Sequence, residues 1–288
     1  MDLKKLLNEK KVLFFDGGTG TELARRGVEA SGMTNLDNPD AILKFHQDYA
    51  ELGADALTTN TFTMNRISVE SKEQDINIRE VNLAGARLAR QAAVDKCYVF
   101  GDIGPTGKLL EPYGTYKEEQ FIDNFAEQAR FLLEGEVDAF IIETMTDLRE
   151  ALCALKAVRS ETDLPVIVTL SFSETGKGGR TIMGNSTSEI AKALEKEGAS
   201  AVGANCGDLS PLEMAEIAAL YRENTDLPVL IQPNAGKPKL KGDETVYDMT
   251  PEDFAGGIMQ GVKNGAVLVG GCCGTTLEHL SAVYKQAR

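Results

Sequence analysis

The sequence contains no tryptophan, only two histidines, and no apolar run of the roughly 20 residues that a membrane-spanning helix needs. Neither histidine, His46 or His279, stands in a pattern typical of a metal ligand. The first ten residues, MDLKKLLNEK, lack the apolar centre of a secretory signal. These absences exclude an integral membrane protein, and we expect no membrane partner.

Cysteine is scarce and odd in number, with five in 288 residues. Such a count argues against a disulfide framework and for a reducing compartment, so we expect a cytoplasmic location. Acidic residues outnumber basic ones by 44 to 30, which gives a formal charge of -14. Nucleic acid and anionic lipid repel a chain of this charge, and neither is expected as a partner.

Eight short apolar runs alternate with segments of helical periodicity along the whole chain. The runs span residues 12–15, 56–59, 98–100, 139–142, 165–170, 201–204, 228–231 and 266–269. Predicted helices include 116–134, 147–160, 188–197 and 211–224, and Ser210-Pro211 and Thr250-Pro251 are typical helix starts. This pattern predicts a single-domain (β/α)8 TIM barrel over residues 1–288, with a doubly wound open sheet as the alternative. Residues 35–45 and 176–185 are expected to form long loops at its mouth.

Polar side chains follow six of the apolar runs, at the predicted carboxyl ends of strands. They are Asp16, Asn60, Asp102, Glu143, Asn205 and Asn234. The active sites of TIM barrels lie where these strand ends converge, so we expect several of these residues to share one pocket. Bracing of the loops explains Asn60, Asp102 and Asn234 as well as substrate contact does.

Three of the five cysteines occur in the same context. Cys206 follows the sixth run, in GANC, and Cys272 and Cys273 follow the eighth, in VGGCCGT. Adjacent side chains on an extended strand point to opposite faces, so the pair can converge only where the chain bends, which the flanking glycines permit. Three thiolates with an open fourth position are typical of catalytic zinc, whereas structural zinc is closed by four protein ligands. Cys97 and Cys153 have no such context.

Seven short motifs occur in an order that resembles one protein family. They are DGGTGTE from residue 16, TNTF from 59, GDIGPTG from 101, ETM from 143, GANC from 203, PNAGKP from 233 and GGCCGT from 270. Over nearly its whole length, the chain resembles the homocysteine S-methyltransferase family. Within that family it is most similar to the homocysteine-binding domain of cobalamin-dependent methionine synthases.

The resemblance implies methyl transfer to the thiol of L-homocysteine, giving L-methionine, at a zinc ion held by Cys206, Cys272 and Cys273. Zinc coordination removes the proton from a thiol and so creates a nucleophile without a general base. Methylcobalamin on another domain or protein is the expected methyl carrier.

The amino acid end of homocysteine needs its own partners. Asp16 and Glu143 are the predicted acceptors for its ammonium group. The backbone N–H groups of Gly17 and Gly18, with Thr59 nearby, are the predicted donors to its carboxylate. Asn205 is expected to orient either Cys206 or the substrate.

Three alternatives differ from this hypothesis. A stand-alone enzyme would use S-methylmethionine, S-adenosylmethionine or betaine directly, although the lack of tryptophan disfavours an aromatic cage for betaine. A zinc-containing module could capture a thiol or dock a partner without catalysis. An aldolase-type barrel would need a lysine at a strand end, and the apolar runs offer none.

Overall fold

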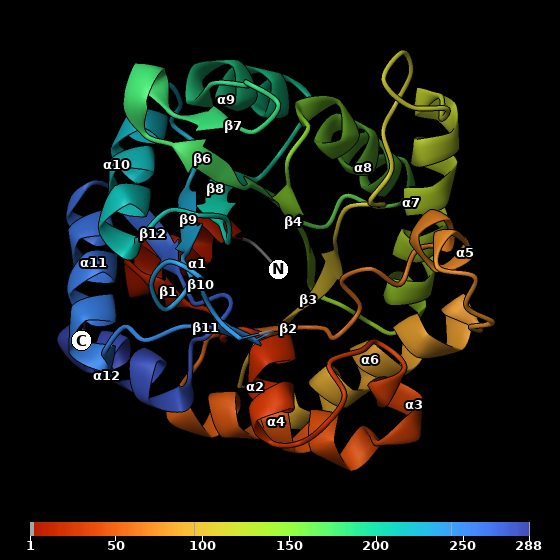
Figure 1. The fold of residues 1–288 in the computed structure, drawn as a ribbon, viewed down its shortest axis with the longest axis horizontal. Coiled ribbons are helices and arrows are strands. Elements are labelled where there is room, and N and C mark those ends of the chain that lie inside the picture. Colours follow the sequence, from red (N-terminus) through yellow and green to blue (C-terminus); the bar gives the residue numbers. More distant parts are fainter. Residues whose placement is uncertain (1–2, 95, 243, 288) are drawn as a thin grey trace.

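The computed structural model describes residues 3–94, 96–242 and 244–287. Within these residues, eight parallel strands form one sheet in the order β1-β12-β9-β8-β5-β4-β3-β2. They are β1 (Leu13–Phe14), β2 (Ala56–Thr58), β3 (Tyr98–Ile103), β4 (Ala139–Met145), β5 (Val166–Leu170), β8 (Ala201–Asn205), β9 (Val229–Gln232) and β12 (Ala266–Val269). A parallel bridge between Phe15 and Ala56 links the two outer strands. The sheet is therefore the predicted TIM barrel, and the doubly wound alternative is wrong (Figure 1).

Helices surround the barrel on all sides, apart from α1, which lies beneath the strands (Figure 1). They are α1 (Leu3–Lys10), α2 (Thr19–Arg25), α3 (Thr34–Asp37), α4 (Pro39–Leu52), α5 (Arg66–Ser71), α6 (Ile78–Ala93), α7 (Glu118–Glu134), α8 (Leu148–Glu161), α9 (Thr187–Lys196), α10 (Pro211–Arg222), α11 (Pro251–Lys263) and α12 (Leu277–Ala287). The four predicted helices are confirmed to within a few residues as α7 to α10. The side chains of Ser210 and Thr250 cap α10 and α11 as predicted, with proline at the first helical turn.

The interior of the barrel is a separate apolar core. Phe15, Phe100 and Leu230 belong to this core, and Leu3 and Leu6 of α1 join it. A larger apolar cluster fills the space between the strands and the outer helices. Because α1 packs against the inner core beneath the strands, the opposite end, where the strands finish, is the end left for a site.

The loop prediction for residues 35–45 is wrong, because this segment lies mostly in α3 and α4. Pro39 occupies the first turn of α4, where its missing N–H costs no hydrogen bond, and Asn38 precedes it. The predicted loop at 176–185 contains a short 3-10 helix η1 (Gly176–Gly178) and β7 (Arg180–Thr181), which pairs with β6 (Phe172–Glu174). A second hairpin, β10 (Lys239–Lys241) with β11 (Glu244–Val246), follows β9.

None of the helices described here has the length and apolar character to span a bilayer.

Candidate metal centre and substrate pocket

Three sulfur atoms converge at the carboxyl end of the barrel. The Sγ atoms of Cys206, Cys272 and Cys273 lie within 4.8 Å of one another, and those of Cys206 and Cys273 are 3.9 Å apart. Four ligands at a Zn–S distance of about 2.3 Å in a tetrahedron place neighbouring sulfurs about 3.8 Å apart. A disulfide would need about 2.05 Å, and all three cysteines are free. The spacing therefore fits three ligands of one metal ion.

The backbone at the end of β9 holds this cluster together. Cys272 donates its N–H to the Pro233 carbonyl at 2.9 Å, and Ala235 donates to the Cys273 carbonyl at 2.9 Å. Cys206 donates to the carbonyl of Gln232 at 3.1 Å and has a left-handed φ of 55°. Hydrogen bonds to the end of β9 and the residues after it thus hold the bend predicted for the cysteine pair. In the sheet, β9 lies between β8 and β12.

The three thiols share their protons unequally. Hydrogen bonds from Cys206 and Cys272 lower the pKa of Cys273 to about 3. The hydrogen bond of Cys272 to Cys206, then that to Cys273, and burial raise the pKa of Cys272 well above its ordinary value. The three thiols thus favour unequal protonation, and a bound divalent cation would deprotonate its sulfur ligands.

Asn234 adds a further feature that fits a cation. Its amide Nδ2 donates to the Gly207 carbonyl at 2.8 Å, while its buried Oδ1 has no hydrogen-bond partner in the described part of the chain. This residue directly precedes Ala235, which bonds to Cys273. A buried acceptor without a partner costs free energy that a bound cation or donor would recover. Asn234 thus braces the loop after Cys206, and its Oδ1 stays free for a ligand.

A pocket of about 670 Å³ joins the cysteines to three carboxyl groups, those of Asp16 and Asp102, which are buried, and that of Glu143, which is partly exposed. Burial raises the pKa of Asp16 to about 7, although its Oδ2 accepts the Thr58 N–H at 2.8 Å. Burial, followed by the charges of Asp16 and Cys273, raises the pKa of Glu143 to about 8.

The third carboxyl group strengthens this acidic character. Burial, followed by the charges of Glu143 and Asp16, raises the pKa of Asp102 well above its ordinary value. Its Oδ1 has no hydrogen-bond partner among the described residues. No ion pair to Asp16, Asp102 or Glu143 forms within the described ranges either. A cationic ligand bound beside these three carboxyl groups would favour their ionised forms.

Asn205 lies behind this pocket, fully buried at the end of β8. Its Oδ1 accepts the Thr144 N–H at 2.8 Å and the Thr169 hydroxyl at 2.7 Å. Its Nδ2 donates to Thr144 Oγ1 at 2.7 Å and, more weakly, to Glu143 Oε2 at 3.4 Å. All of its polar atoms are thus engaged within the chain. The amide fixes the strand end that leads into Cys206 and one face of Glu143.

The predicted donors to a substrate carboxylate are placed less favourably. The N–H of Gly18 donates to Thr275 Oγ1 at 3.1 Å. The Thr59 hydroxyl accepts from Asp102 N at 2.9 Å and pairs with Thr61 at 2.7 Å, while its N–H donates to Phe100. Gly17 lines the pocket beside them and stays the predicted backbone donor. Asn60 is a brace, since its Nδ2 donates to Ser31 O and Asn35 Oδ1.

Sequence analysis missed Tyr247 and Gln232. The Tyr247 ring packs on Gly274, where an added Cβ would lie 2.3 Å from ring Cγ, and its hydroxyl donates a hydrogen bond to Cys273. Tyr247 follows the β10–β11 hairpin, and no local pattern could have placed it over the cluster. Gln232 ends β9 and lines the pocket. The polar-residue-after-apolar-run signal that found Asn234 would also have found Gln232.

Replacing Gly18 with alanine should displace the cysteine turn. A Cβ there would lie 2.4 Å from the Cys272 carbonyl oxygen, a backbone atom that cannot move alone. We expect the free energy of unfolding to fall by about 1–3 kcal/mol and the affinity of the three cysteines for added zinc to drop. Chemical denaturation and zinc titration would measure both effects.

Gly20→Ala is the matched control, because its Cβ would meet nothing nearer than Ala30 Cβ at 3.7 Å. Within α2 this change should stabilise the protein by about 0.5–1 kcal/mol. Equal stability and zinc affinity in the Gly18→Ala and Gly20→Ala variants would contradict the close approach of Gly18 to the cysteine turn.

Comparison with known proteins places this site in a family. The homocysteine S-methyltransferase family matches residues 13–287. The chain is 31% identical over 303 residues to methionine synthase of Mycobacterium tuberculosis and 30% identical over 295 residues to that of Mycobacterium leprae. These alignments cover 98% and 95% of this chain but only 25% and 24% of the relatives, so the chain spans about a quarter of their length.

A solved structure has the same fold along the entire chain. The metallated form of the homocysteine methyltransferase MmuM from Escherichia coli superposes with a TM-score of 0.83, at 20% identity and over 99% of both chains. Its apo form gives a TM-score of 0.78. The extent of the family match and the identity to the mycobacterial relatives lead to one assignment. The chain belongs to the homocysteine S-methyltransferase family.

Proposed function

We propose that this methyltransferase transfers a methyl group to the thiol of L-homocysteine, giving L-methionine, with zinc bound by Cys206, Cys272 and Cys273. One observation carries the proposal: three sulfurs spaced for a single metal ion share a pocket with buried carboxyl groups that have no ion-pair partner in the described chain. Homocysteine presents a thiol and an ammonium group, and the pocket offers a complement to each.

The sulfur end of the pocket supplies the reactive group. Three anionic ligands leave one tetrahedral position open, as in catalytic zinc sites. When bound, zinc would hold the substrate sulfur as a thiolate at neutral pH, where a free thiol is mostly protonated. The hydrogen bond from Tyr247 to Cys273 and the backbone bonds to Cys272 keep the ligand sulfurs in place.

The acidic end of the pocket supplies recognition. An ammonium group favours the ionised form of Asp16 and Glu143, whose raised pKa values reflect burial without a counterion. Binding therefore completes an ion pair that the free protein lacks, with Asn205 steadying Glu143. Gly17 is the proposed backbone donor to the carboxylate. Holding both ends of homocysteine directs its sulfur toward the cysteines.

The proposed methyl donor is methylcobalamin carried by a corrinoid domain or protein. Support comes from the GDIGPTG and PNAGKP motifs and from the identity to mycobacterial methionine synthases, which are about four times as long as the matched region. Direct use of S-methylmethionine, S-adenosylmethionine or betaine is the alternative.

Separate incubations with each donor would decide between these. The zinc-loaded protein and homocysteine are mixed with methylcobalamin, S-methylmethionine, S-adenosylmethionine or betaine, and methionine is measured. We expect methionine with methylcobalamin and little with the other three. Activity with the sulfonium donors alone would overturn the corrinoid proposal. If none of the four donors gives methionine, from protein proven to hold zinc, the result would point instead to a thiol-capture module.

A further inference from the structure

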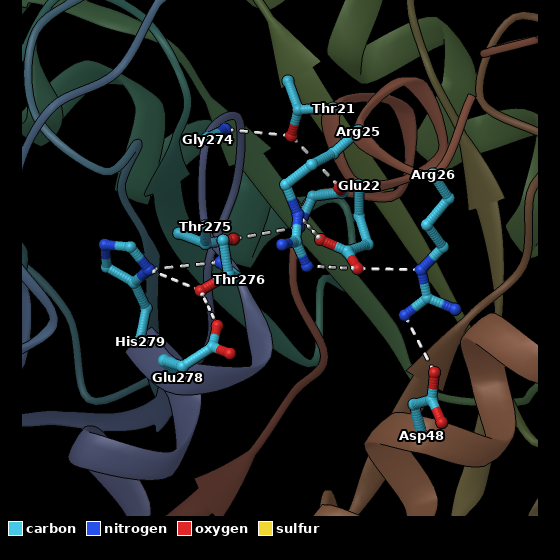
Figure 2. A network of polar contacts seen from close by, with 11 residues as sticks. Thr21, Glu22, Arg25, Arg26, Asp48, Gly274, Thr275, Thr276, Glu278 and His279 are labelled. Atoms are coloured by element: carbon cyan, nitrogen blue, oxygen red, sulfur yellow. Dashed lines mark hydrogen bonds and ion pairs between the residues drawn. The ribbon is translucent and has the colours of Figure 1, made fainter. Parts of the chain in front are cut away.

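The turn that carries two of the three cysteines is tied to the beginning of α2, some 250 residues earlier in the chain. Gly274, directly after Cys273, donates its N–H to Thr21 Oγ1 at 2.9 Å, and Figure 2 shows this bond. The Thr21 hydroxyl in turn donates to the Gly18 carbonyl at 3.2 Å. As an acceptor, this hydroxyl joins the two segments, and as a donor it fixes its own position at the beginning of α2.

Thr275 closes the same tie from the other side. Its Oγ1 accepts the N–H of Gly18 at 3.1 Å and donates to the Cys272 carbonyl at 2.7 Å. Gly18 lies so close to that carbonyl that a Cβ would clash with it. The DGGTGT segment thus matches the shape and the donors of the cysteine turn, and the motif has a use besides substrate contact.

The segment that holds the turn is itself anchored. The Glu22 side chain is fully buried and pairs with Arg25 at 2.9 Å and Arg26 at 2.8 Å (Figure 2). Arg26 continues to Asp48 of α4 at 2.8 Å. A buried carboxylate with two cationic partners costs several kcal/mol to disrupt, so α2 is a firm support.

The far end of the turn is held as well. Thr276 donates its N–H to His279 Nδ1 at 3.3 Å, and His279 Nε2 bonds to the Met249 carbonyl at 2.9 Å. The turn is therefore fixed from α2 and from α12. Within it, Gly274 has a φ of 78°, a backbone conformation that few other residues adopt without strain.

We propose that Thr21 is a positioning residue of the metal centre, which holds the Cys272–Cys273 turn in its ligand geometry before metal binds. This inference rests on the proposed zinc-binding function of the three cysteines. A turn that is already ordered loses little conformational entropy when it binds an ion. The hydrogen bond from Gly274 to Thr21 should therefore raise the affinity of the site for the metal ion. Loss of an outer-shell partner typically lowers metal affinity by about 10–100-fold.

Thr21→Val removes the hydroxyl and keeps the shape of the side chain. In the zinc-free protein, we expect the Gly274 amide to exchange its hydrogen at least about tenfold faster than in the wild type. In a competition with a chelator, we expect zinc affinity to fall by about 10–100-fold. Thr21→Ser, which restores the hydroxyl, should recover most of both.

Thr225→Val is the matched control. The Thr225 hydroxyl also accepts a backbone N–H, from Leu227 at 3.1 Å, and donates to Glu195 at 3.0 Å, but it lies after α10 and away from the pocket. The Thr225→Val variant should lose a comparable amount of stability and keep both the Gly274 exchange rate and the zinc affinity of the wild type. If both variants show the same increase in Gly274 exchange and the same loss of zinc affinity, the effect is a general loosening of the fold, and the positioning role is overturned.

Two other results would also overturn it. Thr21→Val could bind zinc as tightly as the wild type, or it could raise the homocysteine KM with zinc affinity intact, which would make Thr21 a substrate contact. Wild-type protein that binds no zinc would instead overturn the proposed function, and the metal role of Thr21 with it. The wild-type measurement therefore separates failure of the function from failure of the inference.

Discussion

Cys273→Ser should leave the protein folded but almost free of zinc, with methyl transfer reduced by well over 100-fold. Cys273 is one of the three proposed ligands, with its Sγ 3.9 Å from that of Cys206, and interactions with Cys206, Cys272 and Tyr247 lower its pKa. A serine hydroxyl keeps its proton near neutral pH and is a poor ligand for zinc. The expected loss exceeds the roughly 10–100-fold that removal of an outer-shell partner costs, because a direct ligand is gone. Metal analysis under reducing conditions and an assay of methionine formation would measure it.

Cys153→Ala provides the control for this substitution. Cys153 is buried in α8 and belongs to the core between strands and helices. Its removal should lower the free energy of unfolding modestly by leaving a small cavity, and zinc content and activity should stay at the wild-type level. If Cys273→Ser retains stoichiometric zinc, or transfers methyl groups as fast as Cys153→Ala, the proposed metal centre is wrong.

The barrel could be predicted because its strands are short, mostly buried apolar runs, six of which have a polar residue where they end. Asp16, Glu143 and Cys206 are far apart in sequence, yet the parallel arrangement alone brings them to one end of the barrel. The cysteine turn could be predicted for a similar reason, since adjacent cysteines flanked by glycines at a strand end have few other structural explanations.

Contacts between loops could not be predicted in this way. The hydrogen bond between Thr21 and Gly274 and the packing of Tyr247 on Gly274 depend on where segments outside the barrel strands meet. No periodic pattern in the sequence indicates which of these segments come into contact. The engagement of the Thr59 hydroxyl with Asp102 and Thr61 has the same cause. Residues 35–45 differ for another reason, because Pro39 stands in the first turn of α4, where a proline begins a helix instead of interrupting one.

Both ends of the pocket raise the free energy of the folded protein. The three thiols lie close together at the sulfur end, and burial disfavours the charged form of the carboxyl groups at the acidic end. Binding of a metal ion to the thiols and of an ammonium group to the carboxyl groups would lower this free energy. A protein built this way should become more stable when its acidic end is neutralised by mutation, while it becomes worse at binding substrate.

Glu143→Gln tests whether the acidic end lowers stability while it improves substrate binding. Burial raises the pKa of Glu143 from its ordinary 4.5 to about 8, so between these two pH values the folded protein keeps a proton that the unfolded chain releases. The stability of the wild type therefore falls as pH rises through this window, by up to about 1.4 kcal/mol per pH unit. Glutamine does not ionise. The variant should thus gain stability over the wild type from pH 5 to pH 8, on the order of a few kcal/mol, in denaturation experiments on the zinc-free proteins.

The same variant should bind homocysteine at least about tenfold more weakly, since an ion pair to the ammonium group is replaced by a neutral hydrogen bond. In the wild type, KM should rise as pH falls below about 8, because Glu143 loses its charge, and this part of the pH dependence should vanish in Glu143→Gln. Glu150→Gln is the control: Glu150 is also buried but accepts the N–H and hydroxyl of Thr106 outside the pocket, so KM should not change. A Glu143→Gln protein with wild-type KM at every pH would remove Glu143 from substrate recognition, whatever its stability.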